Sequence, residues 1–155
     1  MDEERLVDRA VRVLREGGCD RVLVVLGAWV GDVPGADVVV NEAWPEGMGS
    51  SLRVALDALA DTDVDAALVT LVDLPGLTPL AVRRIIDADA TLAAAAYSGD
   101  RGHPVLFGRE HWAGIADTAR GDAGARDYLR AHAAQLRLIE VGDVASGEDM
   151  DLPPR

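Results

Sequence analysis

The sequence predicts an α/β protein in which a mostly parallel sheet carries helices on both faces. Short, continuously apolar runs alternate with segments of helical periodicity, and glycine or proline separates one from the next. Continuous apolar runs are typical of strands buried on both faces, and their alternation with helices is typical of parallel sheets. The 155 residues form one domain, because no repeat, linker or change of composition divides them.

The first third of the chain predicts a helix, two strands and a second helix. Apolar residues recur at helical spacing from Leu6 to Leu14, and Gly17-Gly18 would end this helix. The expected elements after it are a buried strand over residues 21–27 (RVLVVLG), a shorter strand over 37–40, a turn-rich loop over 41–49 and a helix for which Ser50 is the N-cap.

The rest of the chain continues the alternation. The expected elements are a buried strand over 66–72 that ends at Asp73, a helix opened by Thr78-Pro79, strands over 91–97 and 104–107 joined by a turn, helices near 109–118 and 123–133, and a last strand over 136–141. Ligands of such sheets bind at the carboxyl ends of the strands, so the loops after Gly27, Val72 and Tyr97 should share one rim.

Composition excludes several classes of function. The 27 acidic residues against 15 basic ones leave a net charge of −12, so neither nucleic acid nor a membrane surface is expected as a partner. All the basic residues are arginine, and the absence of lysine excludes P-loop NTPases and Schiff-base enzymes. One cysteine, an acidic start and short apolar runs predict a cytoplasmic protein.

Asp73 is the first candidate site residue. It ends an apolar strand and precedes Leu74-Pro75, where the chain must turn away. A carboxylate at this end of a strand suits Mg²⁺, which is held by one or two carboxylates together with phosphate oxygens. The alternative is a structural aspartate that caps the turn through backbone N–H groups.

A second candidate is the small-residue segment Gly47-Met48-Gly49-Ser50-Ser51 at the start of the predicted second helix. Glycines and hydroxyl residues at a helix start allow backbone N–H groups to approach an anion. The alternative is an ordinary serine cap that follows a glycine turn.

Two further segments complete the set of candidates. Arg101 and His103 could donate to a phosphate or a heterocycle, although a hairpin loop with a solvated arginine is the alternative. The acidic tail over residues 148–153 could bring a second carboxylate to a metal, although acidic tails are usually solvated.

These four segments, in this order, resemble the molybdenum cofactor cytidylyltransferases, a branch of the MobA-like nucleotidyltransferases. The matches run from LVDRAVR at residues 6–12 to the tail, so the resemblance covers essentially the whole chain. WPEGMGSSLR at 44–53 and RGHPVLF at 101–107 are typical of the cytidylyltransferase branch, whereas VDLP at 72–75 is shared more widely.

The resemblance implies a Rossmann-like nucleotidyltransferase fold and a Mg²⁺-assisted reaction. In it, a phosphate of a molybdopterin-type acceptor attacks the α-phosphorus of a nucleoside triphosphate, CTP being favoured over GTP, and pyrophosphate leaves. Carried over by motif, the roles are Asp73 as catalytic residue and metal ligand, Gly47, Met48, Gly49, Ser50 and Ser51 at the nucleotide, Arg101, Gly102, His103 and Pro104 toward the acceptor, and Asp149 or Asp151 as a second metal ligand.

The sequence also departs from the family pattern. The family begins with a strand and a glycine-rich loop, L-A-A-G-x-S-x-R-M-G, that a lysine follows, and this sequence contains neither. We therefore expect an N-terminally truncated domain without the first strand. We also expect this chain to bind a triphosphate poorly and not to catalyse transfer, and to be either marginally stable or self-associated through an exposed sheet edge.

Three other functions are alternatives to this one. A phosphoacceptor receiver domain is disfavoured, because Leu26-Gly27-Ala28 stands where its acidic pair belongs and lysine is absent. Some relatives in the same family are described as nicotine blue oxidoreductases, which leaves an NAD(P)H-dependent redox protein as an alternative. A catalytically inactive binding protein of the same fold is the third.

Overall fold

The computed structural model describes residues 5–27, 31–119, 121 and 124–148 of the chain. Its elements are α1 (Leu6–Gly17), β1 (Leu23–Leu26), β2 (Asp37–Val40), η1 (Trp44–Glu46), α2 (Met48–Ala60), β3 (Ala66–Val69), α3 (Pro79–Asp87), β4 (Leu92–Tyr97), β5 (Asp100–Gly108), η2 (Arg109–His111), α4 (Trp112–Thr118), α5 (Arg126–Ala131) and β6 (Arg137–Glu140). Within the described ranges, no helix has the length and apolar character needed to span a bilayer.

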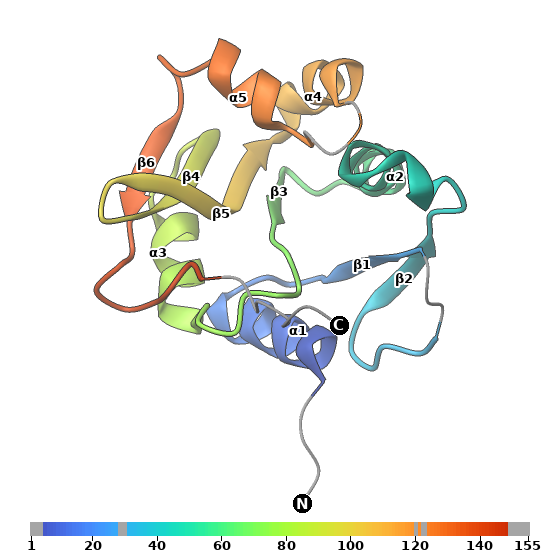
Figure 1. The fold of residues 1–155 in the computed structure, drawn as a ribbon, viewed down its shortest axis with the longest axis horizontal. Helices are drawn as coiled ribbons and strands as arrows, with labels where there is room; N and C mark the ends of the chain where they lie inside the picture. Colours follow the sequence, from blue (N-terminus) through green and yellow to red (C-terminus); the bar gives the residue numbers. More distant parts are fainter. Residues whose placement is uncertain (1–4, 28–30, 120, 122–123, 149–155) are drawn as a thin grey trace, which may run out of the picture.

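The strands form two sheets (Figure 1). β1 and β2 pair in parallel, and a separate four-stranded sheet has the order β3-β5-β4-β6. In the larger sheet β4 and β6 are parallel, and β5 is antiparallel to both β3 and β4, so three of its four strands run in one direction. Among the described strands, β1 pairs only with β2 and β3 pairs only with β5.

Helices cover both faces of the larger sheet, as predicted. β4 shows why, because its side chains alternate between two cores. Leu92 and Ala94 pack with residues of α2, α4 and α5, whereas Ala93 and Ala95 pack with residues of α1 and α3. The exposed fractions of these four side chains are 1% or less. The predicted α/β class with a mostly parallel sheet and helices on both faces is therefore confirmed.

The direction of β5 follows from the turn before it. Only Ser98 and Gly99 separate β4 from β5, and both have positive φ angles, 54° and 86°. Two-residue turns with positive φ at both positions join antiparallel strands, because their twist matches that of the flanking strands. A parallel connection would need a crossover of a dozen or more residues.

Element boundaries agree with the sequence predictions in most places. The largest difference is at β5, which begins at Asp100, four residues before the predicted strand over 104–107. The start of α2 and the end of β3 also differ. Thr78 caps α3 as predicted, since its hydroxyl accepts from the Ala81 amide at 3.3 Å. Ser50 is not the N-cap of α2: Gly47 occupies that position, and Ser50 lies inside the first turn. β3 ends at Val69, three residues earlier than predicted, where its partner on β5 is Val105. The next β5 residue is Pro104, which has no N–H to extend the ladder.

Helix α1 packs closely against α3 at Gly17. A Cβ atom at this position would lie 2.5 Å from Val82 Cβ, and Val82 is fully buried in α3. Such a separation is far inside van der Waals contact, so any side chain here must push the two helices apart. The glycine is therefore needed for the packing of α1 on α3.

We predict that Gly17→Ala destabilises the protein by about 1–3 kcal/mol through overpacking. This loss exceeds the gain of at most about 1 kcal/mol that alanine brings to a helix. Urea denaturation measures the difference. Glu16→Ala, at the neighbouring exposed position, is the control and should change stability by no more than about 0.5 kcal/mol. A Gly17→Ala protein as stable as the parent would contradict this packing.

Candidate functional site

A buried asparagine holds the loop before α2 in place. The Asn41 side chain, 2% exposed, donates from Nδ2 to Ser50 Oγ at 2.9 Å and to Ser51 Oγ at 3.0 Å. Its Oδ1 accepts from the Ala43 amide at 3.0 Å. Asn41 also closes the end of the small sheet, because its amide donates to Leu26 O at 2.7 Å. We call Asn41, Ala43, Gly47, Ser50 and Ser51 the Asn41 cluster.

The predicted nucleotide-binding residues are Gly47, at the N-cap of α2, and Met48 to Ser51, in its first turn. They differ in exposure and in the hydrogen bonds that they make. Gly47 has φ 104° and ψ −172°, a conformation that favours glycine. Ser50 is 4% exposed, and its hydroxyl lies 3.1 Å from Ala43 O and 3.0 Å from Gly47 O. It therefore closes the loop internally instead of capping the helix. Ser51 is half-buried and Met48 is exposed.

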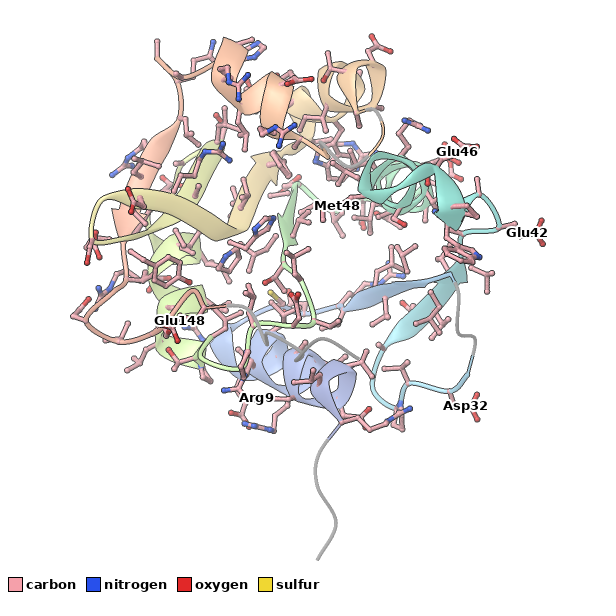
Figure 2. The ribbon with its side chains drawn as sticks, viewed as in Figure 1. Arg9, Asp32, Glu42, Glu46, Met48 and Glu148 are labelled. Atoms are coloured by element: carbon pink, nitrogen blue, oxygen red, sulfur yellow. The ribbon has the colours of Figure 1, made fainter. Side chains whose placement is uncertain are left out.

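Charge around the loop is mixed. Figure 2 shows Glu42 and Glu46 pointing outward from the segment before α2, and both side chains are exposed. Arg53, one turn into α2, lies 3.6 Å from Glu46 and also donates to Ala119 O. An anion bound here would depend on backbone N–H and hydroxyl donors close to it, because the wider field of the chain is negative.

Asp73 follows β3 and carries an unsatisfied carboxylate oxygen. Its Oδ1 is buried, and no donor among the described residues bonds to it. The Thr70 hydroxyl, three residues earlier in the same loop, is also buried without a partner in that part of the chain. A buried polar group without a partner costs about 1–3 kcal/mol, and more when it is charged. Two such groups in one loop indicate that something outside the described residues satisfies them.

The donor set at Asp73 fits a hard divalent cation, which takes carboxylate and hydroxyl oxygens. The described residues contain no group of three or more histidine, cysteine or acidic side chains that could enclose a metal. Asp149 and Asp151, the predicted second ligands, lie outside the described residues. Among the described residues, Asp73 and Thr70 thus supply only part of a metal's ligands, and phosphate oxygens or water would have to supply the others.

The C-terminal segment reaches the Asp73 loop. Ser146 donates its amide to Gly76 O at 3.0 Å, and the Thr78 hydroxyl donates to Val144 O at 2.9 Å. A Cβ atom on Gly76 would lie 2.6 Å from Ser146 Cβ, so the two backbones touch. The chain that leads to Asp149 and Asp151 therefore starts from a point beside the loop that holds Asp73.

The predicted acceptor-side residues begin β5. Arg101 is exposed, Gly102 and His103 are half-buried and Pro104 is buried. Tyr97 anchors this segment: its hydroxyl donates to His103 O at 2.7 Å, and its burial raises the pKa of the phenol.

Tyr97 also joins this segment to the tail. A Cβ on Gly102 would lie 3.1 Å from the Tyr97 ring, and one on Gly147 would lie 2.8 Å from it. The structure thus brings the Asp73 loop, residues 144–148 and the start of β5 together. It shows no hydrogen bond or ion pair from this group to the described residues of the Asn41 cluster.

A groove of about 640 Å³ lies between α2 and α4, and Asn41 and Ala43 of the loop before α2 also line it. Of the predicted site residues that the structure describes, only Ser50 lines the groove, beside Asn41, Arg53, Trp112 and several alanines. Arg109 at its edge donates to three backbone carbonyls of residues 60–64 and lies 4.9 Å from the Trp112 ring centre. The groove contains neither Asp73 nor Arg101, so the residues with candidate chemistry do not share it.

Sequence reasoning missed Glu140, which fixes the turn before Arg101. Its carboxylate accepts from the amides of Ser98, Gly99 and Gly142, each at 2.9 Å. These three backbone hydrogen bonds hold the pKa of Glu140 below its ordinary value. The sequence shows only that an acidic residue stands in the last predicted strand. It does not indicate to which turn the carboxylate would hydrogen-bond.

Comparisons with known proteins agree on one family. The family described as MobA-like NTP transferase domain matches residues 1–136. A nicotine blue oxidoreductase from Paenarthrobacter nicotinovorans is 37% identical over 161 residues, which cover 94% of this chain and 78% of that protein.

The fold of this chain is also similar to that of solved structures. Rv0371c from Mycobacterium tuberculosis H37Rv has a TM-score of 0.78 at 27% identity, over 91% of this chain and 76% of that one. A structure of Rv0371c in complex with manganese has a TM-score of 0.74 at 27% identity, over 88% of this chain and 75% of that one.

We predict that Glu140→Gln lowers stability at neutral pH and that the difference disappears in acid. A carboxylate whose pKa is depressed by folding stabilises the protein above its unfolded pKa, and this contribution is lost as pH falls through the folded pKa. Urea midpoints of parent and variant should therefore differ near pH 7 and converge as the pH falls through the lowered pKa that Glu140 has in the folded protein. The exposed Glu42→Gln is the matched control. A pH-independent difference would contradict the role of the charge.

Proposed function

Because the chain belongs to the family of MobA-like NTP transferase domains, we propose that it transfers a nucleotidyl group from a nucleoside triphosphate to a phosphate. The proposed acceptor is a molybdopterin-type cofactor and the favoured donor is CTP, with GTP as the other candidate. An acceptor phosphate oxygen forms a bond to the α-phosphorus, the bond between the α-phosphorus and its bridging oxygen breaks, and pyrophosphate leaves. Positioning and charge neutralisation are sufficient for this reaction, without a protein nucleophile.

The unpartnered Asp73 Oδ1 is the observation that carries the proposal. A buried carboxylate oxygen without a donor is stabilised by a divalent cation, and the rim of the sheet where it lies is where α/β proteins bind ligands. Asp73 would hold Mg²⁺, with Asp149 or Asp151 as a second ligand. When bound, the cation neutralises charge on the phosphates. The manganese complex of Rv0371c supports a divalent metal in this family.

The other residues have complementary roles in this proposal. Gly47 to Ser51, at the start of α2, present backbone N–H groups and a hydroxyl to the nucleotide. Arg101 is exposed and has no ion-pair partner among the described residues, so its guanidinium is available to an acceptor phosphate. His103 is held by Tyr97 through its backbone and shares that side.

Pyrophosphate release tests the reaction directly. The chain is incubated with molybdopterin, Mg²⁺ and either CTP or GTP at millimolar concentration, because we expect weak triphosphate binding. Acceptor-dependent pyrophosphate release that is faster with CTP supports the proposed activity and overturns the sequence-based expectation that this chain does not catalyse transfer. No release with either nucleotide, in the presence of Mg²⁺ or Mn²⁺, would overturn the proposed activity.

We predict that Asp73→Asn abolishes metal-dependent turnover without a loss of stability. The amide keeps the shape and removes the negative charge from a carboxylate of which one oxygen is buried without a described donor, so the free energy of unfolding should be unchanged or higher. Turnover should fall by about 100-fold or more. Asp61→Asn removes the same charge at an exposed position and should leave both quantities unchanged. Parent-like turnover of Asp73→Asn would refute the metal role.

A redox function is the second candidate, and the 37% identical nicotine blue oxidoreductase favours it. The two functions differ in their substrates and products, so one pair of assays separates them. Oxidation of NADH or NADPH that depends on added nicotine blue, with no pyrophosphate release from CTP, would support the redox function. The opposite result would support nucleotidyl transfer.

A further inference from the structure

The loop after β3 follows a pattern of three residues. Leu71, Leu74 and Leu77 stand three apart, and all three pack into the core between the larger sheet and helices α1 and α3. Leu74 and Leu77 are 6% and 2% exposed, and the Leu77 amide donates to Leu74 O at 3.2 Å. Thr70 and Asp73 each stand directly before one of these leucines. The two polar residues therefore occupy equivalent positions in a loop that leucines hold against the core.

Two oxygens of this loop lack hydrogen-bond partners. Thr70 Oγ1 and Asp73 Oδ1 are both buried, and no described residue bonds to either. A hydroxyl can donate to a carboxylate, so these two groups, only three residues apart, are natural partners for each other. They are not bonded to each other, although a buried polar group without a partner destabilises the folded protein. Two unmet requirements at equivalent positions of one loop indicate a third group that binds both oxygens.

A small divalent cation would satisfy both oxygens at once. Carboxylate oxygens are preferred ligands of Mg²⁺, and a serine or threonine hydroxyl ligates Mg²⁺ in P-loop proteins. Each ligand oxygen lies about 2.1 Å from the ion, so two oxygens on one ion are about 3–4 Å apart. A bridging water would need about 2.8 Å to each oxygen. Because both oxygens are shielded from solvent, direct ligation by the small ion fits the loop better than a bridging water.

We propose that Thr70 is a second protein ligand of the cation at Asp73, with its hydroxyl oxygen bound directly to the ion. This inference rests on the proposed function and deepens it, because it assigns a further residue of the same metal site. It is independent of the tail, since Thr70 and Asp73 lie in one loop that the core holds in place. The loop alone then offers the cation one charged and one neutral oxygen, and phosphate oxygens or water complete the ligand set.

Removal of the Thr70 hydroxyl tests this assignment. Thr70→Val keeps the shape of the side chain and removes its oxygen, so Mn²⁺ should bind about tenfold or more weakly, at least as large a loss as that of an outer-shell partner. Thr70→Ser keeps the hydroxyl and should bind Mn²⁺ like the parent protein. Titration with Mn²⁺ alone, followed by the EPR signal of unbound Mn²⁺, measures these affinities without nucleotide or acceptor.

Thr62→Val, on the other side of β3, is the matched control. The Thr62 hydroxyl donates to Leu59 O at 2.6 Å, so its hydrogen bond is satisfied within the protein. Its removal should lower stability and leave the affinity for Mn²⁺ unchanged.

Stability without metal separates ligation from a structural role of the hydroxyl. In EDTA, Thr70→Val should unfold at the same or a higher urea concentration than the parent protein, because valine removes a buried hydroxyl that has no described partner. Added Mn²⁺ should stabilise the parent protein more than the variant, because the parent binds it more tightly. A hydroxyl that only supports the loop would give the opposite pattern, with a less stable Thr70→Val protein in EDTA and an unchanged affinity for Mn²⁺.

Each outcome decides between specific alternatives. Weaker Mn²⁺ binding by Thr70→Val and by Asp73→Asn, with parent-like binding by Thr70→Ser, supports the inference. Parent-like binding by Thr70→Val, or an equal loss in Thr70→Ser, overturns it and leaves the metal role of Asp73 intact as long as Asp73→Asn loses binding. Parent-like binding by Asp73→Asn overturns both metal assignments.

A parent protein that binds no Mn²⁺ at millimolar concentration also overturns the inference, and pyrophosphate release then decides separately on the proposed function. If Thr70→Val does not fold, Thr70→Ala removes the same oxygen and takes its place in the comparison with Thr70→Ser.

Discussion

The burial of β4 on both faces is the constraint on which the rest of the molecule depends. Residues 93–95 are all alanine and have no exposed surface, and β5 and β6 flank the strand on either side. Small side chains allow two layers of helices to approach one strand closely, so α1 and α3 cover one face and α2, α4 and α5 the other. Because helices pack on both faces of the sheet, the strand ends are held in place, and so are the loops that follow them.

The candidate site combines rigid support with unsatisfied polar groups. Tyr97 and Glu140 fix the start of β5 through backbone hydrogen bonds, and residues 144–146 lie against the loop after Asp73. Within this frame, Thr70 and Asp73 each keep a buried oxygen without a described partner. Buried polar groups without a hydrogen-bond partner in the folded protein are typical of sites where a bound ligand supplies the missing partner. The chain carries a net charge of −12, which disfavours an anionic substrate. Binding of such a substrate therefore depends on local hydrogen-bond donors and on a cation that offsets the negative charge.

Local sequence signals predicted the elements well, and long-range contacts explain the differences. The proline after Thr78 and the apolar run over residues 21–27 are local, and both elements formed where expected. The direction of β5 was not predicted, because it depends on the positive φ angles of Ser98 and Gly99. The role of Ser50 was missed because its partner Asn41 lies nine residues away, in the loop directly after β2. The end of β3 depends on which β5 residue faces it.

The candidate site was predicted by position but not by geometry. Asp73 was identified because it ends a strand, yet nothing in the sequence shows that one of its oxygens is buried without a donor. Glu140 lies more than forty residues from the turn that it fixes, a separation that no short motif can reveal.

The most direct test of the central claim is where a divalent cation binds. Mn²⁺ added with CTP broadens the NMR signals of nearby amide protons, so the broadening locates the metal. If Asp73 is the metal ligand at the nucleotide site, the amides of residues 70–76 should broaden first, and those of Gly47 to Ser51 should respond when CTP is present. Broadening confined to the acidic stretch over residues 61–65, with residues 70–76 unaffected, would contradict the account.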